Sequence, residues 1–574
     1  MKIYIMKIII IGAGQSGLVA CKTFIEQGYD VVVFEKSSHN GLFYSIPEQD
    51  YFRWSSSRYI SGFSDYPIPD EGTAWLTIRQ YQRYLESYKK HFGLDKYIHY
   101  NCKVTYAYPN KKGWVVDYEK NGNYYQQYCN KLVVSTGLNS VPKYPYLGDF
   151  KGKVIHTHDI YQMNKDQWIN LFRGKRVLVM GGGESAFDIG RVAVEYANKV
   201  YYCSKNYIEW FPDAGRTMEE NKEFAECYRS TDLGWKNIGT PTDTHLNYIE
   251  YSLPTPVSGF WHNFGRRIFV LTLGRPVKCS HNHKELCELT DTPENLFSKY
   301  VVKRTPFMCD IHMGKVDLIK YPTEFQTNFV VSDGEKYKVD IIICATGYQK
   351  EFPFLKEKYY KTPLIKKIIP EKYPSIAFIG FARPTMGSIN NISEMQSWWT
   401  ALFWKNQLTY SIRNLQWGRG EDPLDIDNEY VTTIVIGNYY MKDLAMDMGI
   451  QPDLVQILIT DPVLWGKIIH STIHPMLYRL QGQFSYPGSR KVYMNTLPSF
   501  DQKIRNDNGD INPSMIQYYA FFSFLHIIFI LLVIIIIYVI LLLLQKTSKS
   551  KQNILVSTFI VSYVVLLLIY RFWL

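Results

Sequence analysis

The sequence has few cysteines and no pair of them in a spacing that redox or zinc sites use. Nine cysteines are scattered over 574 residues, their number is odd, and no C-x-x-C occurs. This usage favours thiols in a reducing compartment over a disulfide framework. A disulfide reductase is disfavoured, because that reaction needs a redox dithiol. No metal is expected, since the spacing of the one cluster of metal-ligand residue types matches no zinc pattern: Cys279, His281, His283 and Cys287.

Charge is not concentrated along the chain either. The net charge is +11, and residues 518–574 contain four of the basic residues and no acidic one. The remaining positive charge is spread over the rest of the long chain, so nucleic acid is not an expected partner. Internal repeats are lacking, and no signal peptide is expected, because Ile8–Ile11 runs directly into a glycine-rich turn.

A dinucleotide-binding fingerprint stands near the start of the chain. Ile8–Ile11 predicts a buried strand, a glycine turn follows at once, and Val31–Phe34 predicts the next strand. The three glycines of such a turn permit the bend, the approach of a pyrophosphate and close helix–strand packing. Glu35 ends the second strand, where an acid accepts ribose hydroxyls and disfavours a 2′-phosphate, so FAD or NAD is expected. The residues assigned to this site are Gly12, Ala13, Gly14, Gln15, Ser16, Gly17, Glu35 and Lys36.

A second fingerprint lies further along the chain. Val177–Met180 predicts a strand that leads into a glycine turn, and Val200–Cys203 predicts the strand after it. This strand ends in a hydroxyl and a cation, which suit the 2′-phosphate of NADPH, whereas a merely solvated lysine is the alternative. The residues assigned here are Gly181, Gly183, Glu184, Ser185, Ala186, Asp188, Ser204 and Lys205.

Two further segments predict a buried strand followed by a turn of small residues. Leu132–Gly137 precedes the second fingerprint and Ile341–Gly347 follows it. We therefore expect an α/β fold with two Rossmann-like domains, in which the NADPH domain is inserted into a discontinuous FAD domain. The expected boundaries are 1–168 and 336–515 for the FAD domain, 169–335 for the NADPH domain with an insertion at 213–310, and 516–574 for a membrane anchor.

The C-terminal tail predicts membrane insertion. Ala520–Leu544 carries no charge and exceeds the ~20 apolar residues that a transmembrane helix needs. Ile554–Tyr570 is a marginal second span, and the segment between the two carries three lysines. If both segments span, those lysines lie opposite the globular part, against the positive-inside tendency, so the topology stays open. Asn263–Lys278 mixes apolar and basic residues and fits either a helix at a membrane surface or an ordinary packed segment.

The order of these motifs resembles that of the flavin-containing monooxygenases of the animal drug-metabolising type, within the class B flavoprotein monooxygenases. The resemblance covers nearly the whole chain. One departure is Ile160, which stands where the family signature has Tyr or Phe, with Tyr161 one place later. Beyond the fingerprints, the matching segments are Asn40–Phe43, Ser64–Asp70, Phe150–Tyr161, Ala377–Phe381, Ser393–Trp399, Leu458–Pro462 and Tyr478–Arg490.

The resemblance implies FAD and NADPH as cofactors and a monooxygenase reaction. Reduced flavin takes up O2 as a C4a-hydroperoxide, NADP+ stays bound, and a soft sulfur or nitrogen atom of a small lipophilic compound receives one oxygen. It also implies an endoplasmic-reticulum membrane with the catalytic part facing the cytosol, and it leaves the oligomeric state open. Further cofactor contacts are carried over to Gly41, Leu42, Phe43, Val104, Thr136, Gly137, Thr346 and Gly347.

Other functions remain open on the same scaffold. They are a Baeyer–Villiger-type oxygenase, a mainly uncoupled NADPH oxidase, and a membrane flavoprotein that binds nucleotides without turnover. The last is disfavoured, because both fingerprints keep the glycines that backbone contact with a nucleotide requires.

A serine run in an aromatic setting, within residues 51–63, is the second departure from the family. The resemblance aligns Ser55–Arg58 with an N-S-S-K motif whose asparagine reaches both flavin and nicotinamide. Serine has one donor on a shorter arm, so we expect more H2O2 per NADPH here. Ser55 is assigned a catalytic role, with Trp54 and Ser55 expected to face NADP+, and Ser55 and Ser56 to face FAD.

Overall fold

The structure is a computed structural model that describes most of the first 505 residues. The described ranges are 5–41, 46–47, 52–70, 74–205, 209–210, 301–302, 305–349, 351–384, 387–409 and 433–505, with single positions at 511, 513, 516 and 520. The expected insertion and membrane anchor, the Cys279–Cys287 cluster and Asn263–Lys278 therefore lie almost wholly outside the described residues. Among the residues that are described, no helix is long and apolar enough to cross a bilayer.

The first body is built on a parallel sheet with the strand order β22-β7-β1-β2-β3. Alternate residues of β1 point to opposite faces, as the pleat of a strand requires. Ile8 and Ile10 pack in the cluster with α1, α3 and α11, whereas Ile9 and Ile11 pack toward the antiparallel sheet β4-β5-β6. The bounds are β1 Lys7–Ile11, β2 Asp30–Phe34, β3 Ile98–His99, β7 Lys131–Val134, β22 Ile376–Phe378, α1 Gln15–Glu26, α3 Ile78–His91, α11 Ile389–Trp404, β4 Cys102–Asn110, β5 Gly113–Lys120 and β6 Asn123–Cys129.

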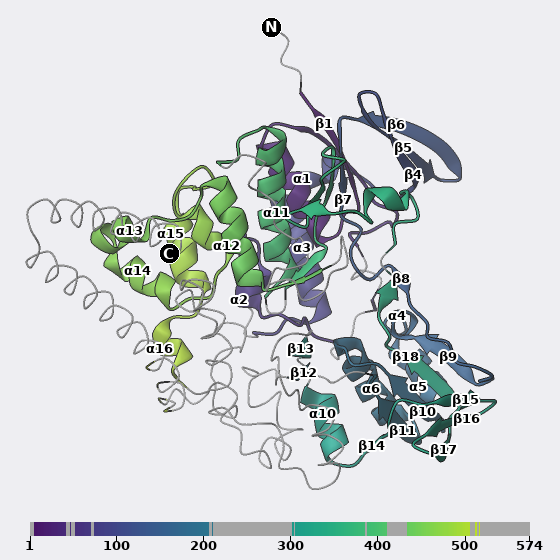
Figure 1. Ribbon diagram of the computed structural model, residues 1–574. Helices are drawn as coiled ribbons and strands as arrows, with labels where there is room; N and C mark the ends of the chain where they lie inside the picture. The colour runs from purple at the N-terminus through teal and green to yellow at the C-terminus, as the bar shows by residue number, and fades with distance from the viewer. Residues whose placement is uncertain are drawn as a thin grey trace, which may run out of the picture.

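The second body repeats this arrangement on a parallel sheet with the order β14-β11-β10-β18-β9. Val177 and Val179 of β10 pack toward α5, α6 and α10, while Leu178 and Met180 pack toward the antiparallel sheet β15-β16-β17. In Figure 1 the first body lies above the second, which is at the lower right. The bounds are β9 Lys153–His156, β10 Arg176–Met180, β11 Lys199–Cys203, β14 Val316–Leu318, β18 Ile341–Cys344, α5 Lys165–Phe172, α6 Glu184–Tyr196, α10 Thr305–His312, β15 Glu324–Gln326, β16 Phe329–Ser332 and β17 Glu335–Lys338.

Shorter elements complete the fold. The helices α12 to α15 lie to the left of α11 in Figure 1. The remaining bounds are α2 Arg58–Ser61, α4 Thr157–Ile160, α12 Gly437–Met448, α13 Leu454–Thr460, α14 Pro462–Ile469, α15 Ser489–Thr496, α16 Phe500–Lys503, β8 Val141–Pro142, β12 Glu209–Trp210, β13 Val301–Val302, β19 Tyr348–Gln349, β20 Leu364–Ile365, β21 Ile369–Pro370, β23 Ala382–Pro384 and β24 Thr433–Val435, with short 3-10 helices at Leu94–Tyr97, Glu357–Tyr359 and Pro475–Arg479.

The expected domain boundaries are wrong at two strands. The expected boundaries put strand β9 in the first part of the FAD domain and β18 in its second part. Both strands belong to the second sheet, where they pair in parallel. A short buried strand does not reveal from its residues which sheet it joins. The chain crosses between the bodies at β8 and β19, which pair antiparallel, and β22 then completes the first sheet.

The described cysteines are mostly buried thiols. Burial raises the pKa of Cys21, Cys129 and Cys344 to about 12, so these thiols stay protonated and inert. Cys309 is the exception among the described cysteines, because it is disulfide-bonded. The expectation of thiols rather than a disulfide framework does not hold at this one position, and scattered spacing could not have revealed it.

A buried ion network holds three distant segments of the first body together. Glu394 of α11 accepts hydrogen bonds from the backbone N–H and hydroxyl of Ser64, and its carboxylate lies 3.1 Å from Arg479. Arg479 also lies 2.9 Å from Asp65, which pairs with Lys22 of α1 at 2.6 Å. Burial raises the pKa of Glu394, and the guanidinium opposes that shift. Each charge is thus retained in the interior by a partner of opposite sign.

We expect Arg479→Met to destabilise the first body strongly. The change leaves buried Glu394 without its guanidinium and removes one of the two cations beside Asp65, and a broken buried pair costs ~3–5 kcal/mol. The check is the urea midpoint followed by tryptophan fluorescence. The control is Arg490→Met, since Arg490 is 54% exposed in its pair with Asp461 and should leave the midpoint nearly unchanged. Equal midpoints for the two variants would contradict the role given to the buried network.

Candidate dinucleotide sites and the loop between them

The first glycine turn is tight on its protein side and open on its other side. A Cβ on Gly12 would stand 2.7 Å from the carbonyl oxygen of Ser135, and one on Gly17 would stand 1.9 Å from that of Gly12. A Cβ on Gly14 would meet nothing within 4 Å, and Gly14 is the N-cap of α1 without a side-chain cap. The positive end of α1 therefore faces open space, which suits a pyrophosphate.

Backbone and side-chain contacts brace this turn. Glu35 is buried, and its two carboxylate oxygens accept the backbone N–H groups of Ala13 at 2.8 Å and Ser37 at 2.9 Å. Asn40 donates to the carbonyl oxygen of Ala13 at 3.1 Å, and Tyr100 donates to Asn40 at 2.7 Å. Sequence reasoning did not select Asn40 and Tyr100, although Asn40 begins a segment that the family resemblance singled out.

The other residues assigned to the first site lie around the same turn. Ser16 is buried with its hydroxyl 2.8 Å from that of Ser393 on α11, and Lys36 is exposed. A Cβ on Gly41 would stand 3.0 Å from the Cα of Gly14, so these backbones approach closely. Leu42 and Phe43 lie outside the described residues.

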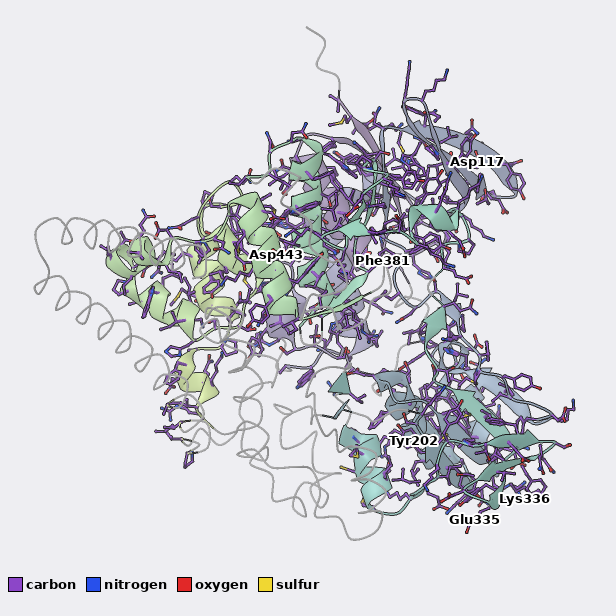
Figure 2. The ribbon with its side chains drawn as sticks, in the orientation of Figure 1. Asp117, Tyr202, Glu335, Lys336, Phe381 and Asp443 are labelled. Atoms are coloured by element: carbon purple, nitrogen blue, oxygen red, sulfur yellow. The ribbon has the colours of Figure 1, made fainter. Side chains whose placement is uncertain are left out.

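The second glycine turn mirrors the first. A Cβ on Gly181 would stand 2.2 Å from the carbonyl oxygen of Ala345, whereas one on Gly183 would meet nothing within 4 Å. Gly183 is the N-cap of α6, again without a side-chain cap. Tyr202 of β11, labelled in Figure 2, donates to the carbonyl oxygen of Gly181 at 2.9 Å and braces the turn. This turn also has the open, positive helix end that a second pyrophosphate would need.

Basic residues replace the acid at the strand end of the second site. Ser204 is half-buried and Lys205 is exposed. Strand β14 pairs in parallel with β11, and its register brings Lys320 to the same edge of the sheet. Lys320 lies 2.9 Å from the exposed Asp333. The hydroxyl of Ser204 and the cation of Lys205 fit a phosphate group, and the strand pairing adds Lys320 at the same edge, where it is paired with Asp333.

A loop of residues 52–56, here called the junction loop, contacts both sites. The ring of Trp54 stacks on Tyr81 of α3, with centroids 3.9 Å apart and an interplanar angle of 18°. The Tyr81 hydroxyl donates to Gln15 at 2.6 Å, at the start of α1. On the other side, Phe52 packs on Tyr161, whose hydroxyl donates to Asp188 of α6 at 2.8 Å. The residues directly before the serine run therefore make contacts toward both helices that follow the glycine turns, α1 through Tyr81 and α6 through Tyr161.

Hydrogen bonds on both sides of Ser55 fix its backbone. The Trp54 N–H donates to Leu76 at 2.7 Å, and the hydroxyl of buried Ser56 donates to the carbonyl oxygen of Gly387 at 2.9 Å. Ser55 itself is half-buried. Beyond the junction loop, Phe63 packs on Tyr84 and Tyr88 of α3. A flexible linker would not make these hydrogen bonds and ring contacts, so the segment is an ordered part of the fold.

His156 secures the point where the chain leaves the second body. Its Nε2 lies 3.0 Å from the carbonyl oxygen of Gly347, and its Nδ1 accepts the N–H of His158 at 3.1 Å. A carbonyl can only accept, so Nε2 carries the proton and the ring is neutral. Burial lowers the pKa of His156, which favours the same state. Ile160 is fully buried nearby and accepts from Trp168, while Tyr161 makes the contact with Asp188.

The remaining assigned residues are distributed between the two bodies. Val104 is half-buried on β4 beside a β-bulge, and Gly137 follows β7 with φ +78° and open space at its Cβ. Thr346 donates to the carbonyl oxygen of Lys143, and Gly347 also has open space at its Cβ. Thr346 and Gly347 lie where the chain crosses between the bodies, directly before the strand β19 that pairs with β8.

We expect Glu35→Gln to weaken flavin retention ~10–100-fold. The amide keeps one acceptor but turns an NH2 group toward a backbone N–H, and a charge-assisted hydrogen bond contributes about 1.5–3 kcal/mol. The measurement is the flavin-to-protein absorbance ratio during dilution. Asp30→Asn, at the exposed start of the same strand, should retain flavin as the wild type does. Retention unchanged in the Glu35 variant would place the ribose elsewhere.

We expect His156→Gln to change how stability depends on pH. The stabilisation from neutral His156 is present above the unfolded-state pKa of about 6.5 and is lost as pH falls toward the lowered pKa of the folded protein. Glutamine keeps a donor for Gly347 but does not titrate. The advantage of the wild type in urea midpoint should therefore shrink below about pH 6.5. A difference that is constant from pH 5 to 8 would contradict this.

Comparisons with known proteins agree with the geometry. The family model described as flavin-binding monooxygenase-like matches residues 5–215 and 262–542. The 4-hydroxybenzoate brominase (decarboxylating) of Marinomonas mediterranea is 29% identical over 86% of this chain and 93% of that protein. Flavin-containing monooxygenase 5 of Homo sapiens is 26% identical over 87% of this chain and 92% of that protein.

A solved structure shows the same fold. S-allyl-L-cysteine S-oxygenase from Allium sativum aligns with a TM-score of 0.52 and 17% identity over 91% of this chain and 100% of that one. The cofactors expected from the two fingerprints, FAD and NADPH, are those of the matched family, which confirms the expectation. The family model covers well over half of the chain. This chain therefore belongs to the flavin-binding monooxygenase-like family of oxidoreductases.

Proposed function

We propose that this chain inserts one oxygen atom of O2 into soft sulfur or nitrogen atoms of small lipophilic compounds, using NADPH and the C4a-hydroperoxyflavin route. The single observation that carries the proposal is the junction loop, which contacts the start of α1 through Tyr81 and α6 through Tyr161. Hydride transfer requires two bound nucleotides to meet, and a loop with contacts toward both nucleotide-binding helices supports the proposal that they meet beside it.

The proposed roles follow from the two glycine turns. The N-termini of α1 and α6 bind the pyrophosphates, with Gly14 and Gly183 leaving room for them. Glu35 holds the ribose of FAD, and Ser204, Lys205 and Lys320 hold the 2′-phosphate of NADPH. Bound flavin supplies the oxygen activation. The chain itself has to orient the nucleotides and exclude water, so no general acid or base is required.

Substrate preference separates this proposal from its alternatives. The named relatives include a brominase of 4-hydroxybenzoate, and the structural neighbours include a cyclohexanone monooxygenase. We would therefore offer purified holoenzyme a thioether, a tertiary amine, a ketone, and 4-hydroxybenzoate with bromide. Sulfoxide or N-oxide as the main product supports the proposal. An ester, a brominated phenol, or H2O2 alone would each replace it with a different reaction.

The membrane is part of the proposal through the sequence of the tail. Ala520–Leu544 anchors the chain in the endoplasmic-reticulum membrane, with the catalytic part facing the cytosol. That Ile554–Tyr570 forms a second span is a separate expectation, which this proposal does not use. An anchor of this kind would keep the enzyme close to substrates that partition into lipid.

We expect Ser55→Asn to raise the coupling of NADPH use to product formation. Asparagine offers two donors on a longer arm, and one more hydrogen bond of about 0.5–1.5 kcal/mol corresponds to a roughly 2–10-fold smaller leak of H2O2. The measurement is H2O2 and sulfoxide per NADPH consumed. Ser485→Asn, at an exposed position whose hydroxyl donates to the carbonyl oxygen of Gly482, is the control. Wild-type protein whose product matches its NADPH consumption would overturn the predicted leak.

A further inference from the structure

Ala13, which stands between the first two glycines of the first turn, is held on both of its sides. Its N–H donates to the carboxylate of Glu35 at 2.8 Å, and its carbonyl oxygen accepts from the amide of Asn40 at 3.1 Å. All three residues are buried. Each of the two peptide planes that flank Ala13 therefore has one fixed end, and neither can rotate without breaking a buried hydrogen bond.

The second of these peptide planes decides where the N–H of Gly14 points. No cis peptide bond occurs in the described part of the chain, and in a planar trans unit the C=O and the N–H point in opposite directions. Because Asn40 holds the carbonyl of Ala13, the N–H of Gly14 points away from Asn40. Among the described residues, none accepts a hydrogen bond from this N–H. A donor of this kind at the N-cap of a helix suits a phosphate oxygen.

The donors behind Asn40 determine which end of its amide faces Ala13. The hydroxyl of Tyr100, between β3 and β4, lies 2.7 Å from Oδ1 of Asn40 and 3.3 Å from Nζ of Lys89. An ammonium group can only donate, so the hydroxyl accepts from Lys89 and donates its own proton to Asn40. The oxygen of the Asn40 amide is thereby directed to Tyr100, and its NH2 group faces the carbonyl of Ala13.

Lys89 is itself fixed at the far end of this series. It is a buried residue of α3, and its ammonium group lies 2.8 Å from Asp95 and 3.1 Å from Glu86. Burial raises the pKa of Tyr100, so its hydroxyl keeps the proton that it donates. The three side chains of Lys89, Tyr100 and Asn40, here called the α3 relay, therefore connect an ion pair on α3 to a carbonyl of the glycine turn.

The second glycine turn has a different support. There Tyr202 donates to the carbonyl oxygen of the first glycine, Gly181, at 2.9 Å. Gly182 corresponds to Ala13, and no side chain in the described part of the chain donates to its carbonyl oxygen. The α3 relay is thus particular to the first turn, and the second turn offers an internal control.

We propose that Asn40, oriented by Tyr100 and Lys89, is a positioning residue for the pyrophosphate of FAD, because it aims the N–H of Gly14 at a phosphate oxygen. The inference rests on the assignment of FAD to the first turn in the proposed function. Asn40 acts through the peptide between Ala13 and Gly14. A mobile peptide would have to be ordered when the nucleotide binds, and the α3 relay removes that cost beforehand.

The test uses the full chain, freed of its flavin, and follows the fluorescence of FAD as it rebinds. ADP and adenosine serve as competitors, since ADP contains a pyrophosphate as FAD does and adenosine has none. For Asn40→Ala we expect the inhibition constant of ADP to rise roughly 5–10-fold, the equivalent of one lost hydrogen bond. The constant of adenosine should stay unchanged, because Glu35 is still present to hold the ribose.

Tyr100→Phe tests whether Tyr100 acts through Asn40. The variant keeps the ring and removes only the hydroxyl, so the amide of Asn40 is free to turn its oxygen toward Ala13. We expect the constant of ADP to rise roughly 2–5-fold, and the double variant to be no weaker than Asn40→Ala alone. The matched control is Tyr29→Phe, since the buried hydroxyl of Tyr29 also donates to a backbone carbonyl, that of Ala401, at 2.8 Å. It should leave both constants unchanged.

Four results would overturn the proposal. Equal losses for ADP and adenosine would mean that Asn40 supports the whole turn, and additive effects of the two substitutions would mean that Tyr100 acts independently of it. An unchanged constant for ADP in both variants would remove the role altogether. A parallel loss of affinity for NADP+, the internal control at the second turn, would assign the effect to folding.

The same measurements separate this inference from the function on which it rests. ADP that fails to compete with FAD in the wild type would overturn the assignment of FAD to the first turn, and the role of Asn40 with it. Competition in the wild type without any effect of the variants would overturn the role of Asn40 alone. Sulfoxide formation by the flavin-loaded protein tests the oxygenase proposal independently of both.

Discussion

The contact of Trp54 with Tyr81 is the interaction on which the site depends. Tyr81 is fully buried; its ring supports Trp54, and its hydroxyl donates to Gln15 and accepts from Asn390 at 2.7 Å. One side chain thus joins the junction loop, the start of α1 and the start of α11. A buried hydroxyl with both its donor and its acceptor role filled can hold only one arrangement, and so it orients all three segments together.

The two bodies have the same backbone geometry at their glycine turns. In each, the first glycine of the turn approaches the backbone of the neighbouring small-residue segment, at Ser135 in one body and at Ala345 in the other. The second glycine leaves the helix end open in both. What differs is the strand end, where a buried acid braces the first turn and basic residues lie beside the second. The shared backbone geometry suits a diphosphate, and in the proposed function a few side chains decide which nucleotide is held.

Ion pairs in the interior fix how distant segments of the first body are arranged, which apolar packing alone would not specify. The network from Lys22 through Asp65 and Arg479 to Glu394 connects α1, the segment after the junction loop, and α11. Around Lys366, two aspartates of α12 play a similar part, and Asp443 of this pair is shown in Figure 2. Breaking such groups is costly, because a charge left alone in the core cannot regain its hydration. This network fixes α1, which follows the first glycine turn, against the segment after the junction loop and against α11.

Much of the fold was readable from local pattern. Short apolar runs before glycine turns marked β1, β10 and their successor strands within one residue, because strand ends and glycine turns are set by nearby residues. The family followed from the order of the motifs and is confirmed by the comparisons. The nucleotide contacts of Ser55 and the tail in the membrane remain predictions.

Other features depended on contacts between residues far apart in the chain. The residues of Ile341–Cys344 do not indicate which of the two sheets this strand joins. Its pairing with β9 and β10 decides that. Asn40, Tyr81 and Lys320 entered the sites only through such pairing and packing. By itself the sequence determined two glycine turns after buried strands, and the family of the chain. Only the tertiary structure decided which strands serve each turn and what holds the loop between them, because those choices rest on packing across hundreds of residues.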